Sequence, residues 1–147
     1  MFIGKFYHSL EEKGRISLPK KFRQESKSWV ITRGLDGGLF IFKEEDFEKE
    51  IAKFESRTFT NKNNRDFIRL MTNEAQTLQP DKTGRVQLPE YLIDFAKLDK
   101  SVVVVGSLSR IEVWDRDRYH NYIDGIENKT EEIAESLSET EKSNHDK

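Results

Sequence analysis

Residues 8–19 read HSLEEKGRISLP, and residues 76–89 read QTLQPDKTGRVQLP, with nearly the same order of residue types. In both stretches an acidic residue precedes a glycine–arginine pair, apolar and polar residues then alternate, and a Leu-Pro pair ends the pattern. The Gly-Arg and Leu-Pro pairs of the second copy lie 70 residues after those of the first. A single duplication with so long a period predicts two copies of one supersecondary unit, which complete a core together.

Each copy is expected to begin with a β-hairpin. Residues 6–10 and 15–18 alternate between an apolar and a more polar face, as half-buried strands do. Lys13-Gly14 lies between them and can reverse the chain, because glycine adopts positive φ angles at little cost. The second copy offers the same two strands around Gly84.

A short helix, a second strand pair and an amphipathic helix should follow in each copy. Pro19 and Pro89 suit the first turn of a helix. The amphipathic helices carry apolar residues at i, i+4 and i+7, which is the spacing of a core stripe. The expected elements are helices over 20–26 and 90–98, strand pairs over 28–34 with 38–42 and 101–107 with 110–114, core stripes Phe47-Ile51-Phe54 and Tyr119-Ile123-Ile126, and a linker helix over 63–73.

These elements predict a β-rich α+β protein with four regions. Each repeat by itself would be marginally stable, so the two should form one pseudo-two-fold, β-barrel-like body in which the hairpins swap or interleave. The tail has seven acidic and three basic residues, and it is expected to be a frayed helix or disordered. The predicted regions are a first repeat over 1–56, a linker helix region over 57–73, a second repeat over 74–126 and the acidic tail over 127–147.

The composition argues against an enzyme. The absence of cysteine excludes a disulfide framework, a thiolate zinc site and a cysteine nucleophile. His8, His120 and His145 lie far apart, and none stands at a metal-ligand spacing. His8 falls on the apolar face of its strand and is expected to be a core residue. No nucleophile elbow or phosphate-cradling loop is present, so we expect no cofactor, no metal and no small-molecule substrate.

Charge and hydropathy favour a partner that is a polyanion. No run approaches the ~20 apolar residues that cross a bilayer, and the N-terminus lacks the apolar block of a signal peptide. A cytoplasmic protein without a membrane partner is therefore expected. Residues 13–27 contain six basic residues and one acidic residue, although the whole chain has a net charge of −2. Such a basic cluster attracts polyanions.

Arg15 and Arg85 are the repeated residues that packing does not explain. Strand alternation points them away from the apolar face, and an acid, Glu11 or Asp81, lies four residues before each. A carboxylate at that position could hold the guanidinium by a bidentate hydrogen bond. The alternative is a surface ion pair that only stabilises the turn, worth about 0–1 kcal/mol.

The repeated pattern acid-x-x-Gly-Arg-hydrophobic-x-hydrophobic-Pro resembles the swapped-hairpin DNA-binding element of the AbrB/SpoVT class. Two copies in one chain, with the opening MFIGKFYHSLEEKGRISLP and the segment VVVVGSLSRIEVW, resemble the MraZ family over roughly residues 1–125. This resemblance implies a double-split β-barrel with flanking helices. It further implies a bacterial transcriptional regulator that assembles as a ring, associates with the nucleoid and binds repeated promoter boxes upstream of division and cell-wall genes.

The resemblance also implies the residues that would contact double-stranded DNA. The family's paired Asp-x-x-x-Arg motifs fall on Glu11 with Arg15 and on Asp81 with Arg85, and the first motif departs from the family by its glutamate. Arginine suits the guanine edge or a phosphate, and lysines supply contacts to phosphate. An oligomerisation or protein-interaction module without specific DNA binding is the alternative. The candidate DNA-binding residues are Glu11, Lys13, Arg15, Ser17, Lys20, Lys21, Asp81, Lys82, Arg85 and Gln87.

Overall fold

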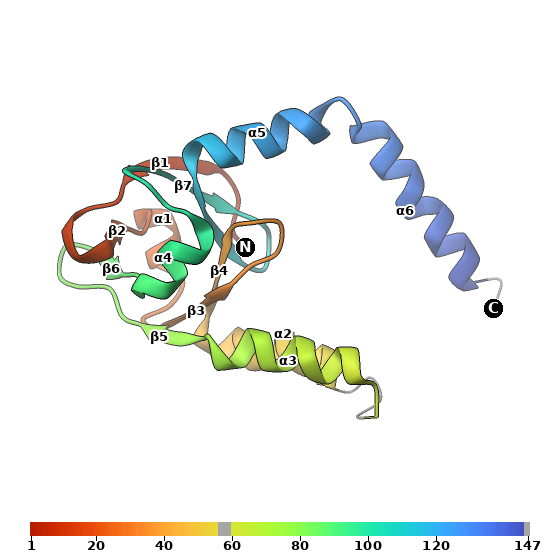
Figure 1. Cartoon of the computed structure of the whole chain (residues 1–147), viewed down its shortest axis with the longest axis horizontal. Helices are drawn as coiled ribbons and strands as arrows, with labels where there is room; N and C mark the ends of the chain where they lie inside the picture. The colour runs from red at the N-terminus through yellow and green to blue at the C-terminus, as the bar shows by residue number, and fades with distance from the viewer. Residues whose placement is uncertain (56–59, 146–147) are drawn as a thin grey trace. The chain divides into compact units, whose positions relative to one another are not determined.

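The helices and strands follow one another in nearly the same order in the two repeats. The computed structural model (Figure 1) describes residues 1–55 and 60–145, and the chain forms two compact units, Met1–Arg116 and Asp117–Lys147. The first repeat contributes β1 (Lys5–Ser9), β2 (Arg15–Ser17), α1 (Lys20–Arg23), β3 (Trp29–Arg33), β4 (Leu39–Lys43), α2 (Glu44–Glu55) and α3 (Lys62–Asn73). The second contributes β5 (Gln76–Leu78), β6 (Arg85–Gln87), α4 (Glu90–Ala96), β7 (Ser101–Gly106), β8 (Ile111–Asp115), α5 (Arg116–Glu127) and α6 (Thr130–His145).

The strands of the two repeats interleave. One sheet has the order β1-β7-β8-β4-β3-β5, and a second sheet consists of β2 and β6. If each strand is exchanged for its counterpart in the other repeat, both orders are reproduced, so the topology has a pseudo-two-fold axis. Of the strand pairs in the described residues, β3–β4 and β7–β8 lie within a repeat, and the others join the two repeats. Neither repeat could therefore form this sheet alone.

The predicted local hairpin of β1 with β2 is wrong. β1 pairs antiparallel with β7 over five residues, and β2 pairs with β6. Only the bridge between Glu11 and Arg15 joins the two arms of the turn. Within this turn, Lys13 and Gly14 both have positive φ angles, 64° and 74°.

The α+β class and the strand-rich body are confirmed, whereas the closed barrel is not observed. Among the described strands, β1 and β5 are the two edges of the six-stranded sheet, and no ladder joins them. The boundary predicted between residues 56 and 57 lies outside the described residues. Within the described part of the chain, no helix has both the length and the apolar content needed to span a bilayer.

The main core lies between the sheet and the β2–β6 pair. Ile16 of β2 and Val86 of β6 are 0% and 1% exposed, as the strand alternation predicted. Phe2 packs edge-on against Phe22 of α1, with ring centroids 5.3 Å apart, and lies 5.9 Å from Trp29. Burying an aliphatic or aromatic side chain contributes about 1.5–3 kcal/mol, so these residues fix the β2–β6 pair onto the body.

The helices α2 and α3 cover a second apolar cluster. They lie side by side as a helical hairpin (Figure 1), and the rings of Phe54 and Phe67 are 4.6 Å apart. The cluster joins Phe40 and Phe42 of β4 to Ile51 and Met71. The predicted linker helix is confirmed, with bounds Lys62–Asn73.

The corresponding stripe of the second repeat differs from the prediction. Tyr119, Ile123 and Ile126 of α5 are only partly buried, and no side chain of α5 is fully buried. The helix that follows, α6, carries Ile133 and Leu137, which are themselves exposed. It therefore has no apolar face comparable to the one that α3 supplies to α2. Within the predicted acidic tail, residues Thr130–His145 form the helix α6.

Candidate nucleic-acid interface

Both Gly-Arg motifs meet in the two-stranded β2–β6 ribbon. The strands pair antiparallel, so that Arg15 lies opposite Gln87 and Ser17 opposite Arg85. Ile16 and Val86 between them face the core. Because side chains alternate along a strand, the four polar residues share the outer face of the ribbon. Residues that are 70 positions apart in the sequence thus form one polar surface.

Each end of the ribbon is bound to the other repeat. The backbone N–H of Leu18 donates to the Gly84 carbonyl over 3.1 Å, and the N–H of Leu88 donates to the Gly14 carbonyl over 2.8 Å. Gly84 has a φ angle of +82°, a conformation that glycine adopts without steric cost. The two turns are therefore fixed by reciprocal backbone hydrogen bonds between the repeats.

In the second turn, Asp81 organises the backbone and holds Arg85. Its Oδ1 accepts hydrogen bonds from the Thr83 N–H, the Thr83 hydroxyl and the Arg85 N–H, at 2.9, 2.8 and 3.0 Å. Its Oδ2 accepts from Arg85 Nε at 3.2 Å. The hydrogen bond from the Arg85 backbone N–H, followed by that from the Thr83 hydroxyl, lowers the pKa of Asp81 to about 2. The carboxylate therefore stays ionised across the physiological range.

The expected pair of Glu11 with Arg15 does not form. The Glu11 carboxylate instead accepts from Arg85 Nη1 at 3.2 Å, and this interaction raises the pKa of Arg85. Arg15 Nε reaches only the Glu12 carbonyl, at 3.4 Å. The Glu11 carboxylate thus joins Asp81 on the same guanidinium. Arg85 is thus held by two acids, and Arg15 has no carboxylate partner among the described residues.

Basic side chains occur in and beside the segments that form the ribbon. Lys13, Lys82, Lys20 and Lys21 are exposed. A hollow of about 440 Å³ adjoins the second turn and is lined by Arg23, Ser26, Lys27, Pro80, Asp81, Lys82, Thr83 and Gly84. Arg23 is not among the residues that the sequence predicted to contact DNA, although it belongs to the basic run over residues 13–27.

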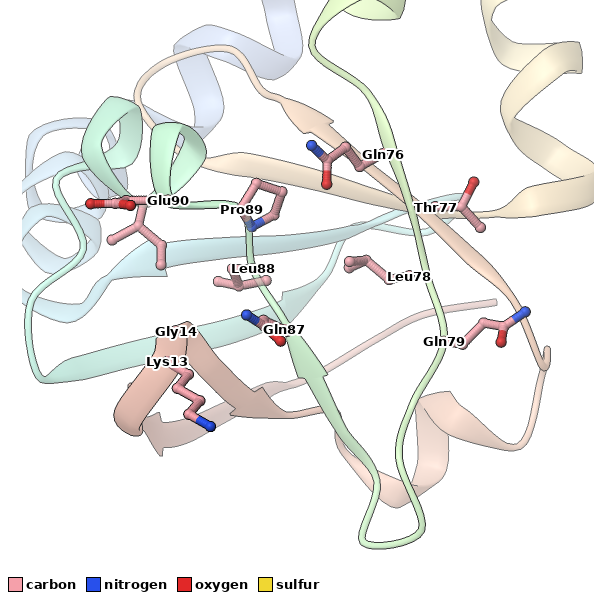
Figure 2. Close-up of a pocket in the computed structure, with 11 residues that line it drawn as sticks. Lys13, Gly14, Gln76, Thr77, Leu78, Gln79, Gln87, Leu88, Pro89 and Glu90 are labelled. Atoms are coloured by element: carbon pink, nitrogen blue, oxygen red, sulfur yellow. The ribbon is translucent and has the colours of Figure 1, made fainter.

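A larger hollow of about 760 Å³ opens beside the ribbon on the side of the first turn. Figure 2 shows Gln76, Thr77 and Gln79 on one chain segment, and Gln87 and Pro89 on the segment that continues from β6 into α4. The lining is mixed and includes both charged side chains and glutamines. Within the residues that the structure describes, no group of three or more histidine, cysteine or acidic residues is placed to hold a metal ion.

Comparison with known proteins gives one consistent result. The family model described as "MraZ protein, putative antitoxin-like" matches twice, over residues 1–70 and 71–140. A protein named Transcriptional regulator MraZ from Carboxydothermus hydrogenoformans is 40% identical over 138 residues, which cover 93% of this chain and 96% of the relative. Proteins of the same name from Halothermothrix orenii and Pediococcus pentosaceus are 39% and 40% identical over 95% and 93% of this chain, and over 98% and 96% of their own lengths.

Proposed function

Because the chain belongs to the MraZ family, we propose that it is a transcriptional regulator that reads double-stranded DNA with the outer face of the β2–β6 ribbon. The observation that supports this is the pairing of the two Gly-Arg motifs in one ribbon, with Arg15, Ser17, Arg85 and Gln87 on its outer face. The family assignment also confirms that the chain is not an enzyme, since the named relatives are transcriptional regulators.

A two-stranded ribbon has the right size for the DNA major groove, which is about 12 Å wide. Arginine donates to guanine O6 and N7, glutamine can bind adenine on two atoms, and serine can bind either kind of base. Arg15, Arg85, Gln87 and Ser17 would therefore contact base edges. Lysines at the margin, namely Lys13, Lys82, Lys20 and Lys21, would contact phosphates and position the ribbon without reading the sequence.

The two arginines differ in what they can offer to DNA. Arg85 uses Nε for Asp81 and Nη1 for Glu11, but a guanidinium has five N–H donors, so it still has donors for a base. Arg15 donates a hydrogen bond from Nε to the Glu12 carbonyl. Both arginines therefore keep donors for DNA contacts, and Arg85 does so in a fixed orientation.

We also propose that the protein acts as a homo-oligomer, in the ring form that the family resemblance implies, on repeated boxes in nucleoid DNA upstream of its own division and cell-wall gene cluster. One ribbon with three residues in each strand has a small footprint, so binding to several boxes at once would raise the affinity by avidity. The interleaved repeats are compatible with the swapped-hairpin class. Light scattering should give a mass several times 17.3 kDa.

Fluorescence anisotropy with DNA from upstream of the protein's own gene, and with a scrambled duplex of the same length, tests the proposal. An arginine–guanine contact is worth about 1–3 kcal/mol of discrimination, so Arg15→Ala/Arg85→Ala should lose the preference for the specific duplex. Lys20→Ala/Lys21→Ala is the matched control, because it removes two positive charges outside the ribbon. It should weaken binding to both duplexes equally and reduce the salt dependence of the binding affinity.

A wild-type protein that binds both duplexes equally would contradict specific DNA recognition. Such a result would favour the interaction module without sequence-specific binding.

A further inference from the structure

The two turns of the ribbon are contacted by different side chains from the opposite repeat. Arg23, at the end of α1 in the first repeat, donates from Nη1 to the Thr83 carbonyl of the second turn at 3.1 Å. A Cβ placed on Gly84 would overlap this guanidinium. Arg23 therefore packs directly on the second turn, and Gly84 has no side chain that would keep it away.

The equivalent position in the other half of the molecule has no such contact. Ile93 of α4 lies 70 residues after Arg23 and faces the first turn, with its Cδ1 2.7 Å from where a Cβ on Gly14 would be. Isoleucine has no hydrogen-bond donor in its side chain, so it cannot bind a carbonyl of that turn. The two halves of the molecule therefore differ at this equivalent position, which is arginine in the first repeat and isoleucine in the second.

Arg23 starts a chain of hydrogen bonds that ends at the Arg85 guanidinium. It binds the carbonyl of Thr83, whose N–H and hydroxyl both donate to Asp81. Asp81 in turn accepts from the backbone N–H and the Nε of Arg85. Among the described residues, Arg15 lies at the end of no comparable chain, and its Nε binds the Glu12 carbonyl.

We propose that Arg23 is a positioning residue for DNA recognition, which holds the second turn so that Arg85 is oriented before DNA binds. This inference rests on the proposed function, and it makes the two turns unequal. The second turn, held by Arg23, reads its base with a fixed arginine. The first turn, contacted by Ile93, carries an arginine that adjusts to the DNA. Side chains that are held in the productive geometry discriminate better, because less conformational freedom is lost on binding.

Arg23→Ile tests the proposal, because it gives the second turn the residue that the first turn already faces. The preference for specific over scrambled DNA should fall by about 2- to 13-fold, the range that corresponds to the net contribution of one hydrogen bond. Lys27→Ala is the matched control, since Lys27 lines the same hollow and carries the same charge. It should weaken binding to both duplexes alike. Arg23→Lys, which retains a donor for the Thr83 carbonyl, should recover part of the preference.

A second readout does not depend on DNA. Hydrogen exchange of the Thr83, Gly84 and Arg85 amides should be faster in Arg23→Ile than in the wild type, while the Gly14 amide in the first turn keeps its rate. Unchanged exchange at residues 83–85 would overturn the positioning role. If exchange is faster in Arg23→Ile but the wild type shows no preference for the specific duplex, the proposed function is refuted and the contact of Arg23 with the second turn is established.

The inference would also be overturned if Arg23→Ile, like Lys27→Ala, lost the same amount of binding affinity for the specific and the scrambled duplex. In that case Arg23 would be a phosphate contact like its neighbour.

Discussion

Gly84→Ala should lower the free energy of unfolding through two separate effects, backbone strain and the loss of a hydrogen bond. Gly84 has a φ angle of +82°, which costs an L-residue roughly 1–2 kcal/mol. The new Cβ would also overlap Arg23 Nη1 and displace it from the Thr83 carbonyl. A protein hydrogen bond contributes about 0.5–1.5 kcal/mol net. The expected loss in the free energy of unfolding is therefore roughly 1.5–3.5 kcal/mol.

A double-mutant cycle separates the two costs. In an Arg23→Ala background the hydrogen bond is already absent, so Gly84→Ala should cost only the backbone strain of roughly 1–2 kcal/mol. The two substitutions together should therefore destabilise the protein less than the sum of the single effects, by about 0.5–1.5 kcal/mol. Urea-induced unfolding of the full chain at one protein concentration measures this, because association makes stability depend on concentration.

Gly14→Ala is the control for the cycle. Gly14 also has a positive φ angle, +74°, but the atoms near its added Cβ belong to Ile93 and Leu88. Its effect should therefore add to that of Arg23→Ala within about 0.5 kcal/mol. If Gly84→Ala and Arg23→Ala are equally additive, Arg23 does not pack on the second turn in solution, and the reasoning is wrong.

Three further predictions concern titration and helix stability. Since hydrogen bonds lower the pKa of Asp81 to about 2, from about 3.9 when unfolded, stability should be lost as the pH falls from about 4 towards 2. Asp81→Asn should flatten this acid limb in urea titrations, and an unchanged slope would contradict the prediction. Burial lowers the pKa of His8, so protonation opposes folding and the urea midpoint should fall as the pH drops below about 6.5. His8→Leu, which copies Leu78 of the second repeat, should reduce the fall, and an equal fall in both proteins would exclude His8 as its cause. Apart from the helix's own backbone and the residues next to Gly125, no described atom lies within 4 Å of a Cβ added at Gly125 of α5, so Gly125→Ala should stabilise the helix by up to about 1 kcal/mol. Circular dichroism during thermal unfolding measures this, and a lower helix stability would show that Gly125 meets a neighbour in solution.

Patterns of neighbouring residues predicted the elements and their faces. The alternation around Ile16 and Val86 identified the buried side of β2 and β6, and the glycines of both turns were predicted to adopt positive φ angles, as they do. The linker helix followed from its spacing of apolar residues. These features depend on the local backbone geometry of strands, turns and helices, which a short stretch of sequence is sufficient to specify.

The same patterns could not identify which strands pair or which helices pack together. Strand alternation shows which side of β1 is apolar, but it is compatible with either β2 or β7 as the neighbouring strand. In the folded structure β1 pairs with β7. The stripe on α5 resembled that of α2, yet α6 carries no apolar face like that of α3. Whether an apolar stripe is buried depends on a second element, and a stripe by itself does not contain that information.

The candidate site shows the same division. The sequence by itself determined that each repeat has an arginine after its turn glycine, on the outer face of a strand. The tertiary structure alone decided that the two strands pair, that Glu11 binds Arg85 and not Arg15, and that Arg23 reaches Thr83. These contacts join residues 60 to 74 positions apart. They form because the two repeats bury their apolar faces against each other, which brings these residues together. Burial of apolar surface is not directional, so no spacing in the sequence indicates which distant residues will meet.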